Sequence, residues 1–284
     1  MGTKIRIMTS NIWGDYFGNP VEVREMGLYD TFCRYNPDII GMQEATVAWG
    51  DSRLFKLLTK EYTFVPTDAI VSKWYADNTD DEGVRDLMAR GKSAGQNFVP
   101  MVYKTDKYEL VDCGWHHFSD TPDPSKCVNY AVLRDKTTGG VFGVCSTHFW
   151  WMTGEEHDRL RDKNAAEMLD VMKIIREKYN CTVFAFGDFN CKVTSTAFGV
   201  LIDGGCTNMQ KSAKETSDIC TLHGDPVRQD DGTYKGYTTD KGPEHSIDHI
   251  ICLGESDVSK YDVITDVDAL DATDHSPVYA DVII

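Results

Sequence analysis

The segment Val183-Phe184-Ala185-Phe186-Gly187-Asp188-Phe189-Asn190 joins an apolar run to a short polar turn. The run from Thr182 to Phe186 has the length and the composition of a buried strand. Asp188 and Asn190 follow at its end, where a sheet delivers polar side chains to its rim. The segment therefore predicts a strand that carries chemistry at its last residues.

Apolar runs of similar length recur along the chain and predict further strands. They are Ile5 to Met8, Ile39 to Met42, Phe98 to Tyr103, Val141 to Ser146, Ser246 to Cys252 and Val278 to Ile284. The clearest helix follows Thr153, which forms a capping-box pattern with Glu156. Its apolar positions are four and three residues apart, at Met168, Met172, Ile175 and Tyr179. Some strand runs follow one another without a helix, which favours layered sheets with helices outside, an α/β fold of the α+β type.

Composition and charge restrict the class of protein. The chain has 284 residues, 41% of them hydrophobic, and its 45 acidic and 29 basic side chains give a net charge of −16. Disordered and collagen-like proteins are excluded, and no apolar run approaches the roughly 18 residues of a membrane helix. The negative charge disfavours nucleic acid as a partner, although a local basic groove is compatible with it. Nothing indicates membrane insertion or an obligate protein partner.

The nine cysteines are odd in number and contain no C-x-x-C pair, so neither a zinc knuckle nor a disulfide framework is indicated. Several lie in apolar runs, which suits buried thiols in a reducing compartment. The chain enters a strand pattern at Lys4 without a secretory signal. We therefore expect a cytoplasmic protein, unless a signal peptide preceded this start.

The least patterned stretch runs from Thr67 to Gln96 and includes an acidic cluster at Asp77, Asp80, Asp81 and Glu82. It predicts a long loop, which in compact folds is either a lid or a solvated excursion. His116 and His117 have no third ligand at short range, so we expect them to be structural.

Polar side chains follow most of the predicted strands and come from the whole length of the chain. They are Asn11, Glu44, His148, Asp188, Asn190, Asp248, Asp274 and His275. Each is costly to bury without a partner, so their place at strand ends indicates a common site. Oxygen ligands without a cysteine cluster favour Mg²⁺ or Mn²⁺ over zinc. Because such a metal neutralises phosphoryl charge, the set predicts phosphoester chemistry.

The order of these fragments, Asn, Gln-Glu, Thr-His, Gly-Asp-Phe-Asn, Ile-Asp and Asp-His, resembles the endonuclease/exonuclease/phosphatase superfamily. The resemblance spans Asn11 to His275 and implies a single domain over residues 1–284. The implied fold is deoxyribonuclease-I-like, a four-layer α/β/β/α sandwich of two packed mixed sheets flanked by helices. The implied activity is that of a metal-dependent phosphoric ester hydrolase (EC 3.1 class), with Mg²⁺ or possibly Mn²⁺ as cofactor.

By this resemblance Glu44 binds the metal and Asn11 lies beside it. Asp188 orients and deprotonates the attacking water, while Asn190 holds the scissile phosphate or a second metal. An Asx-turn is the structural alternative for Asp188 and Asn190.

The resemblance also assigns roles to three residues near the end of the chain and to one histidine in its middle. His275 binds phosphate and stabilises the transition state, Asp248 fixes its tautomer, and Asp274 adds charge or a metal contact. His148 contacts the phosphate or assists the leaving group. Without the resemblance, these four residues are ordinary turn and strand-end residues.

Two places depart from the family pattern. His249 stands where family members commonly carry an aromatic residue, and we expect this to change packing. The segment from Phe118 to Asp123 resembles a Ser-x-Thr-Pro-Asp segment of a bacterial branch, which often continues into a strand with an arginine. The nearest counterpart here, Val128 to Ala131, holds no arginine, so no phosphate-binding arginine is identified.

The superfamily cleaves nucleic acids, inositol phosphates, sphingomyelin and nucleotides, so the motifs predict the reaction and not the substrate. We expect a small or soluble phosphomonoester or phosphodiester, with a DNA or RNA endo- or exonuclease as the alternative. A sphingomyelinase-like lipid phosphodiesterase and an inactive scaffold are less favoured, because no aromatic docking hairpin stands out and no motif residue is missing. The candidate substrate contacts are Asn190, His148, Trp150 and Tyr234. One of Trp150 and Trp151 could face the site as a stacking platform for a base or a sugar, and the alternative is one core and one surface tryptophan.

Overall fold

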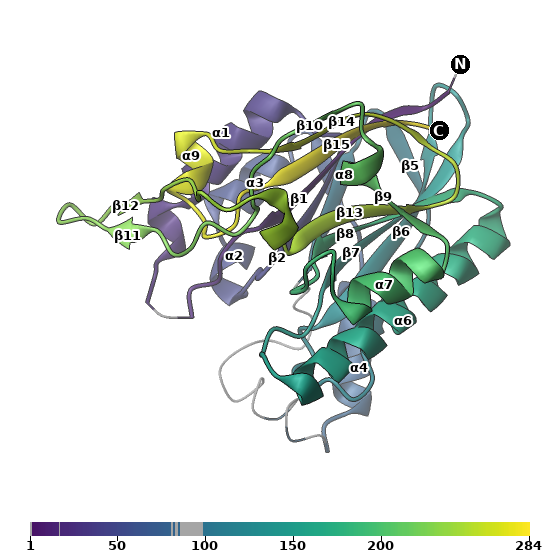
Figure 1. Ribbon diagram of the computed structural model, residues 1–284, viewed down its shortest axis with the longest axis horizontal. Coiled ribbons are helices and arrows are strands. Elements are labelled where there is room, and N and C mark those ends of the chain that lie inside the picture. The colour runs from purple at the N-terminus through teal and green to yellow at the C-terminus, as the bar shows by residue number, and fades with distance from the viewer. Residues whose placement is uncertain (1, 17, 81, 83–84, 86–98) are drawn as a thin grey trace.

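The computed structural model describes residues 2–16, 18–80, 82, 85 and 99–284 (Figure 1). One sheet has the strand order β10-β14-β15-β1-β2-β4-β3, and the other has the order β5-β6-β7-β8-β13-β9. The first comprises β1 (Lys4–Asn11), β2 (Ile39–Gln43), β3 (Tyr62–Phe64), β4 (Met101–Lys104), β10 (Glu215–Thr216), β14 (Asp257–Val263) and β15 (Val278–Ile283). The second comprises β5 (Tyr108–His117), β6 (Cys127–Asp135), β7 (Val141–His148), β8 (Thr182–Asp188), β9 (Cys206–Asn208) and β13 (Asp248–Leu253). Both sheets mix parallel and antiparallel neighbours.

Helices cover the outer faces of the two sheets, which pack against each other at the centre (Figure 1). The first sheet carries α1 (Glu25–Tyr35), α2 (Val47–Gly50), α3 (Arg53–Leu58) and α9 (Val267–Leu270), and the second carries α6 (Glu155–Tyr179) and α7 (Thr196–Asp203). Ile7, Phe186 and Ile250 belong to the core between the sheets. The four-layer α/β/β/α sandwich that the motif order implied is therefore confirmed.

The shorter elements complete the chain. They are η1 (Val21–Val23), α4 (Asp68–Asp77), α8 (Met209–Ser212), η2 (Pro243–His245) and a hairpin of β11 (Val227–Arg228) and β12 (Tyr234–Lys235). The hairpin extends away from the two sheets (Figure 1). No helix in the described part of the chain combines the length and the apolar character that crossing a membrane requires.

The long helix α6 has the expected buried stripe, with Met168 and Met172 fully covered and Ile175 nearly so. Its expected start was wrong, because the helix begins at Glu155 after an N-cap at Gly154, and no side chain caps it. Acidic side chains in the first turn, among them Glu155, favour this end electrostatically in place of a capping hydroxyl.

The predicted loop from Thr67 to Gln96 was also partly wrong. Its first part forms α4, in which Val71 and Tyr75 are buried, and Trp74 packs edge-on against Trp115 of β5 at 5.2 Å between ring centroids. Most of the remainder, with Asp81, Gly91 and Gly95, lies outside the described residues, as does Phe98 of an expected strand.

Strand register brings three of the predicted site residues together. Asp188 at the end of β8 lies opposite His148 of β7 and opposite Asp248 of β13. Gly187 makes this pairing possible, since its φ of 150° suits glycine and a Cβ there would meet the Thr147 carbonyl oxygen at 2.0 Å. Three motif residues distant in sequence are therefore adjacent at one rim.

Candidate active site

Asn11 and Glu44 supply the part of the rim that belongs to the first sheet. The Asn11 amide nitrogen donates to Glu44 Oε1 at 3.1 Å and to Asp188 Oδ2 at 3.2 Å, so it bridges two carboxylates. The Asn11 oxygen accepts the Trp13 N–H at 3.0 Å, which is consistent with this orientation of the amide. The backbone N–H of Gly14 donates to Glu44 Oε2 at 2.9 Å.

Glu44 has a positive φ of 60°, a backbone conformation that non-glycine residues rarely adopt. Burial opposes its ionisation, but His148, Lys126 and the Gly14 N–H outweigh burial and lower the pKa of the carboxyl. Glu44 is therefore held as an anion that faces the other sheet's rim residues.

His275 and Asp248 form a buried pair, with His275 Nδ1 at 2.9 Å from Asp248 Oδ2. Burial alone would lower the pKa of His275, yet Asp248 and Asp274 raise it well above its ordinary value. Its other ring nitrogen, Nε2, lies 3.9 Å from Asp274 Oδ2. The imidazolium is thus oriented by Asp248 and keeps Nε2 as a donor.

Asp188 lies between the two histidines, with His148 Nε2 at 3.4 Å and His275 Nδ1 at 4.0 Å from its Oδ2. Burial opposes ionisation of this carboxyl too, but the two histidines and Lys126 lower its pKa far below the ordinary range. An ionised Asp188 can accept hydrogen bonds from a water molecule at the rim.

Lys126 is a site residue that the sequence analysis missed. Its ammonium lies 2.8 Å from Nε2 and 3.1 Å from Nδ1 of His148, and the residue is only 5% exposed. Burial lowers the pKa of Lys126, against the opposing effect of Asp123, Glu44 and Asp188. Lys126 directly precedes β6 and lies two residues before Val128, where the resemblance led us to expect a strand with an arginine. The upstream resemblance to the Ser-x-Thr-Pro-Asp segment was the signal that could have found it.

Asn190 forms the Asx-turn that was the structural alternative for it, and its contact with phosphate or a second metal stays a prediction. Its backbone N–H donates to Asp188 Oδ1 at 2.8 Å, which is the expected Asx-turn, and its φ is 48°. Its amide nitrogen donates to the Phe149 carbonyl at 3.1 Å, so the amide is anchored beside the end of β7. His249, the departure from the family pattern, is buried with Nε2 at 2.8 Å from the Cys191 carbonyl oxygen.

The two aromatic candidates for substrate contact lie in different surroundings. Trp150 is 6% exposed and its indole N–H donates to His157 Nδ1 at 2.9 Å, whereas Trp151 is 57% exposed. Tyr234 is 8% exposed and packs edge-on against Trp13 at 5.6 Å between ring centroids. Substrate contact by Trp150 and Tyr234 stays a prediction.

The residues present fit a divalent cation. Asp188, Asp248 and His275 each offer one ligand atom within 4.8 Å of the others, and His275 can act as a ligand only when its ring is neutral. Asp248 Oδ1 is buried and has no hydrogen-bond partner among the described residues. Burial raises the pKa of Asp274 to about 7, with the neighbouring Glu44 carboxylate adding to this effect and His275 opposing it. Carboxylate oxygens gathered at one rim suit Mg²⁺ or Mn²⁺.

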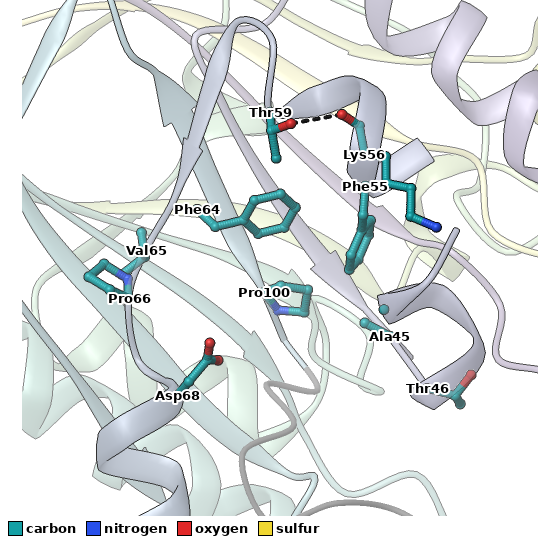
Figure 2. A pocket seen from close by; sticks show the side chains of 11 residues that line it. Ala45, Thr46, Phe55, Lys56, Thr59, Phe64, Val65, Pro66, Asp68 and Pro100 are labelled. Carbon is teal, nitrogen blue, oxygen red and sulfur yellow. Dashed lines mark hydrogen bonds between the residues drawn. The ribbon is translucent and has the colours of Figure 1, made fainter. Parts of the chain in front are cut away.

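A separate cavity of about 630 Å³ lies beside α3 and the edge of the first sheet (Figure 2). Phe55, Phe64 and Pro100 line it, and its cation, Lys56, donates to the Asp51 carbonyl at 2.5 Å. None of the motif residues lines this cavity, although it reaches Ala45, directly after Glu44. We therefore place the candidate chemistry at the rim and not in the cavity.

The comparisons with known proteins agree with this geometry. No family model matches the chain, and no curated protein matches it in sequence. Among solved structures, an endonuclease/exonuclease/phosphatase family protein from Bacteroides thetaiotaomicron is similar at a TM-score of 0.73 and 19% identity, over 100% of this chain and 99% of the other. A mannosyl-6-phosphatase from the same organism is similar at 0.72 and 18%, over 99% and 100% of the two chains.

A third similar structure is D. rerio TDP2 in complex with a single-strand DNA product, at a TM-score of 0.66 and 16% identity over 99% of each chain. Identities this low establish the fold, which in each case extends over nearly the whole chain. The chain thus has the deoxyribonuclease-I-like fold of the endonuclease/exonuclease/phosphatase proteins.

Proposed function

We propose that this protein is a member of the endonuclease/exonuclease/phosphatase family and a phosphoric ester hydrolase that depends on Mg²⁺ or Mn²⁺. The observation that carries the proposal is the buried rim in which Asp188 lies between His148 and His275, with Asn11 bridging it to Glu44. Burying ionic groups of this kind costs stability, and perturbed pKa values cluster at functional sites.

Glu44, Asn11 and Asp274 would hold the metal, and Asp188, Asp248 and His275 would face the phosphate. When bound, the cation supplies positive charge to the phosphoryl oxygens. Asp188 accepts a proton from the attacking water as the water oxygen bonds to phosphorus. Nε2 of His275 donates to a phosphoryl oxygen, and the orienting hydrogen bond to Asp248 keeps this nitrogen directed at the substrate.

The bond from phosphorus to the leaving oxygen breaks as the water oxygen attacks, and the leaving oxygen then needs a proton. Lys126 and His148 lie on the side of Asp188 opposite Asp248 in the strand order, and either can supply it. Lys126 also provides a cation close to the segment Val128 to Ala131, which lacks the phosphate-binding arginine of the bacterial branch.

A small or soluble phosphoester is the favoured substrate. The net charge of −16 leaves little general attraction for a polyanion. One solved structure with this fold is named a mannosyl-6-phosphatase, which agrees with a small monoester. The alternative, a nuclease, is supported by the complex of a similar protein with single-strand DNA. We also propose a reducing, cytoplasmic setting, because all nine cysteines are free and seven are buried.

The test is Mg²⁺-dependent turnover of p-nitrophenyl phosphate, bis-p-nitrophenyl phosphate and plasmid DNA, measured side by side. Asp188→Ala should remove at least ~10²-fold of the rate, because the water loses its orienting base. Cleavage of the small esters alone supports the favoured substrate class, and plasmid nicking that the variant loses supports the nuclease. Activity that persists in the variant at excess Mg²⁺ refutes the role of Asp188.

A further inference from the structure

The loop of residues 149–154, between β7 and α6, leaves directly from the candidate active site. The Phe149 N–H donates to the Asp188 carbonyl at 2.9 Å, and the Asn190 amide donates to the Phe149 carbonyl. A chain advances at most about 3.6 Å per residue, so the Cα of Trp151 lies within about 11 Å of the Cα of His148. This distance is short enough for the leaving group of a phosphoester at the rim to span.

The backbone on both sides of Trp151 is anchored to α6. Arg161, which is only 6% exposed, donates from Nη1 to the Trp150 carbonyl at 3.1 Å and to the Met152 carbonyl at 2.5 Å. The Asn164 side-chain oxygen accepts the Trp150 N–H at 3.0 Å, and Asn164 is fully buried. Two buried polar side chains therefore hold this loop in one conformation.

Within this anchored loop, neighbouring side chains have different surroundings. The Trp150 ring is buried against α6, while Trp151 is 57% exposed and its neighbour Met152 is 38% exposed. A buried guanidinium is costly unless its hydrogen bonds are satisfied, and here the bonds of Arg161 fix the backbone around an exposed tryptophan. Exposure of Trp151 is thus built into the loop by the same contacts that bury Trp150.

Charge near this ring limits what it can bind. Glu155, Glu156 and Asp158 form the first turn of α6, and the first of them is four residues from Trp151. Asp158 pairs with Arg161 and Glu155 pairs with Arg159, so both arginines at this end of α6 already have an acidic partner. A second phosphate therefore meets no unpaired arginine on this part of α6, whereas a neutral ring needs no ionic partner.

From these observations we infer that Trp151 determines specificity by stacking on the flat apolar face of an uncharged ring in the leaving group. The ring is a nucleobase or a sugar, since both present such a face to tryptophan. This inference rests on the proposed function, because it places the scissile phosphate at Asp188, His275 and Lys126. The leaving group then extends past His148 onto Trp151.

The test compares the full-length protein with Trp151→Ala on three Mg²⁺-supported substrates: a nucleoside 5′-monophosphate, mannose 6-phosphate and glycerol 3-phosphate, which has no ring. Loss of one stacked ring corresponds to about 5- to 100-fold in affinity. We expect KM for a ring substrate to rise by this factor with little change in kcat, and glycerol 3-phosphate to respond less than twofold. Trp151→Phe should restore part of the loss.

Ile174→Ala is the matched control, because Ile174 is an apolar residue of α6 with 63% exposure. Sensitivity confined to the nucleotide identifies a base, and sensitivity confined to the sugar phosphate identifies a sugar. An equal loss on all three substrates, or no loss on any, overturns the inference. Calorimetric measurement of the binding of the same compounds distinguishes failure of the proposed function from failure of the Trp151 inference. If wild type turns over none of them, the proposed substrate class fails, and if Trp151→Ala binds the ring compounds as wild type does, the inference fails.

Discussion

Replacing His223 with leucine should remove part of the protein's sensitivity to acid. Both ring nitrogens of His223 are buried and have no hydrogen-bond partner among the described residues. Burial, together with the nearby positive charge of His275, lowers the pKa of His223 to about 4. The unfolded chain has the ordinary value of 6.5. Between these values only the unfolded chain takes up the proton, so stability is lost as the pH falls through this range.

The expected magnitude follows from the two pKa values. At 1.36 kcal/mol per pKa unit, the interval from 6.5 to about 4 corresponds to about 3 kcal/mol, of which about 2.5 kcal/mol is reached at pH 4.5. The free energy of unfolding is measured by urea titration at pH 7.0 and pH 4.5. The loss between the two pH values should be about 2 kcal/mol smaller in His223→Leu than in wild type.

His245→Leu is the control, because it removes a histidine whose side chain is 41% exposed. Carboxyl groups that titrate in the same range are common to all three proteins and cancel in the comparison. If His223→Leu and wild type lose the same free energy between pH 7.0 and pH 4.5, the buried neutral state of His223 is refuted.

Three further substitutions test the rim. Glu44→Gln should move the Mg²⁺ titration of activity to higher concentration, because it removes one ligand charge, and an unchanged titration would exclude Glu44 as a ligand. Lys126→Met should lower kcat/KM by about 10²-fold through loss of a buried cation, with Lys126→Arg retaining more activity; equal activity of the two variants contradicts this role. Asp248→Asn should lower the pKa of His275, visible in its NMR titration, and reduce kcat by about 10- to 100-fold. A His275 titration that does not move would mean that Asp248 does not set its charge.

The strands that were predicted lie inside the two sheets and are mostly buried. β1, β2, β7, β8, β13 and β15 were all found, because central strands between two layers read as short continuous apolar runs. β5 was missed, because it lies at the edge of its sheet and interrupts its apolar residues with Glu109 and the two histidines. α4 was missed for a related reason, since only Val71 and Tyr75 of its ten residues are buried.

The start of α6 illustrates a local signal that tertiary structure overrides. Thr153 and Glu156 match a capping box, yet the residues before the helix belong to the loop that Arg161 holds. Gly154, with a φ of 120°, takes the cap position instead. The chain enters α6 in a direction set by the active-site loop and not by the best capping side chain.

The sequence by itself determined which residue types were available and approximately where the predicted strands end. Six site residues could be named because each lies next to an apolar run that predicts a strand. They are Asn11, Glu44, His148, Asp188, Asp248 and His275. Only the tertiary structure determined which of these side chains contact one another. The distances between His148, Asp188 and Asp248 follow from strand register, which depends on partners far along the chain. The burial of Lys126 and the exposure of Trp151 were also determined by the tertiary structure, because both result from packing that no local sequence pattern indicates.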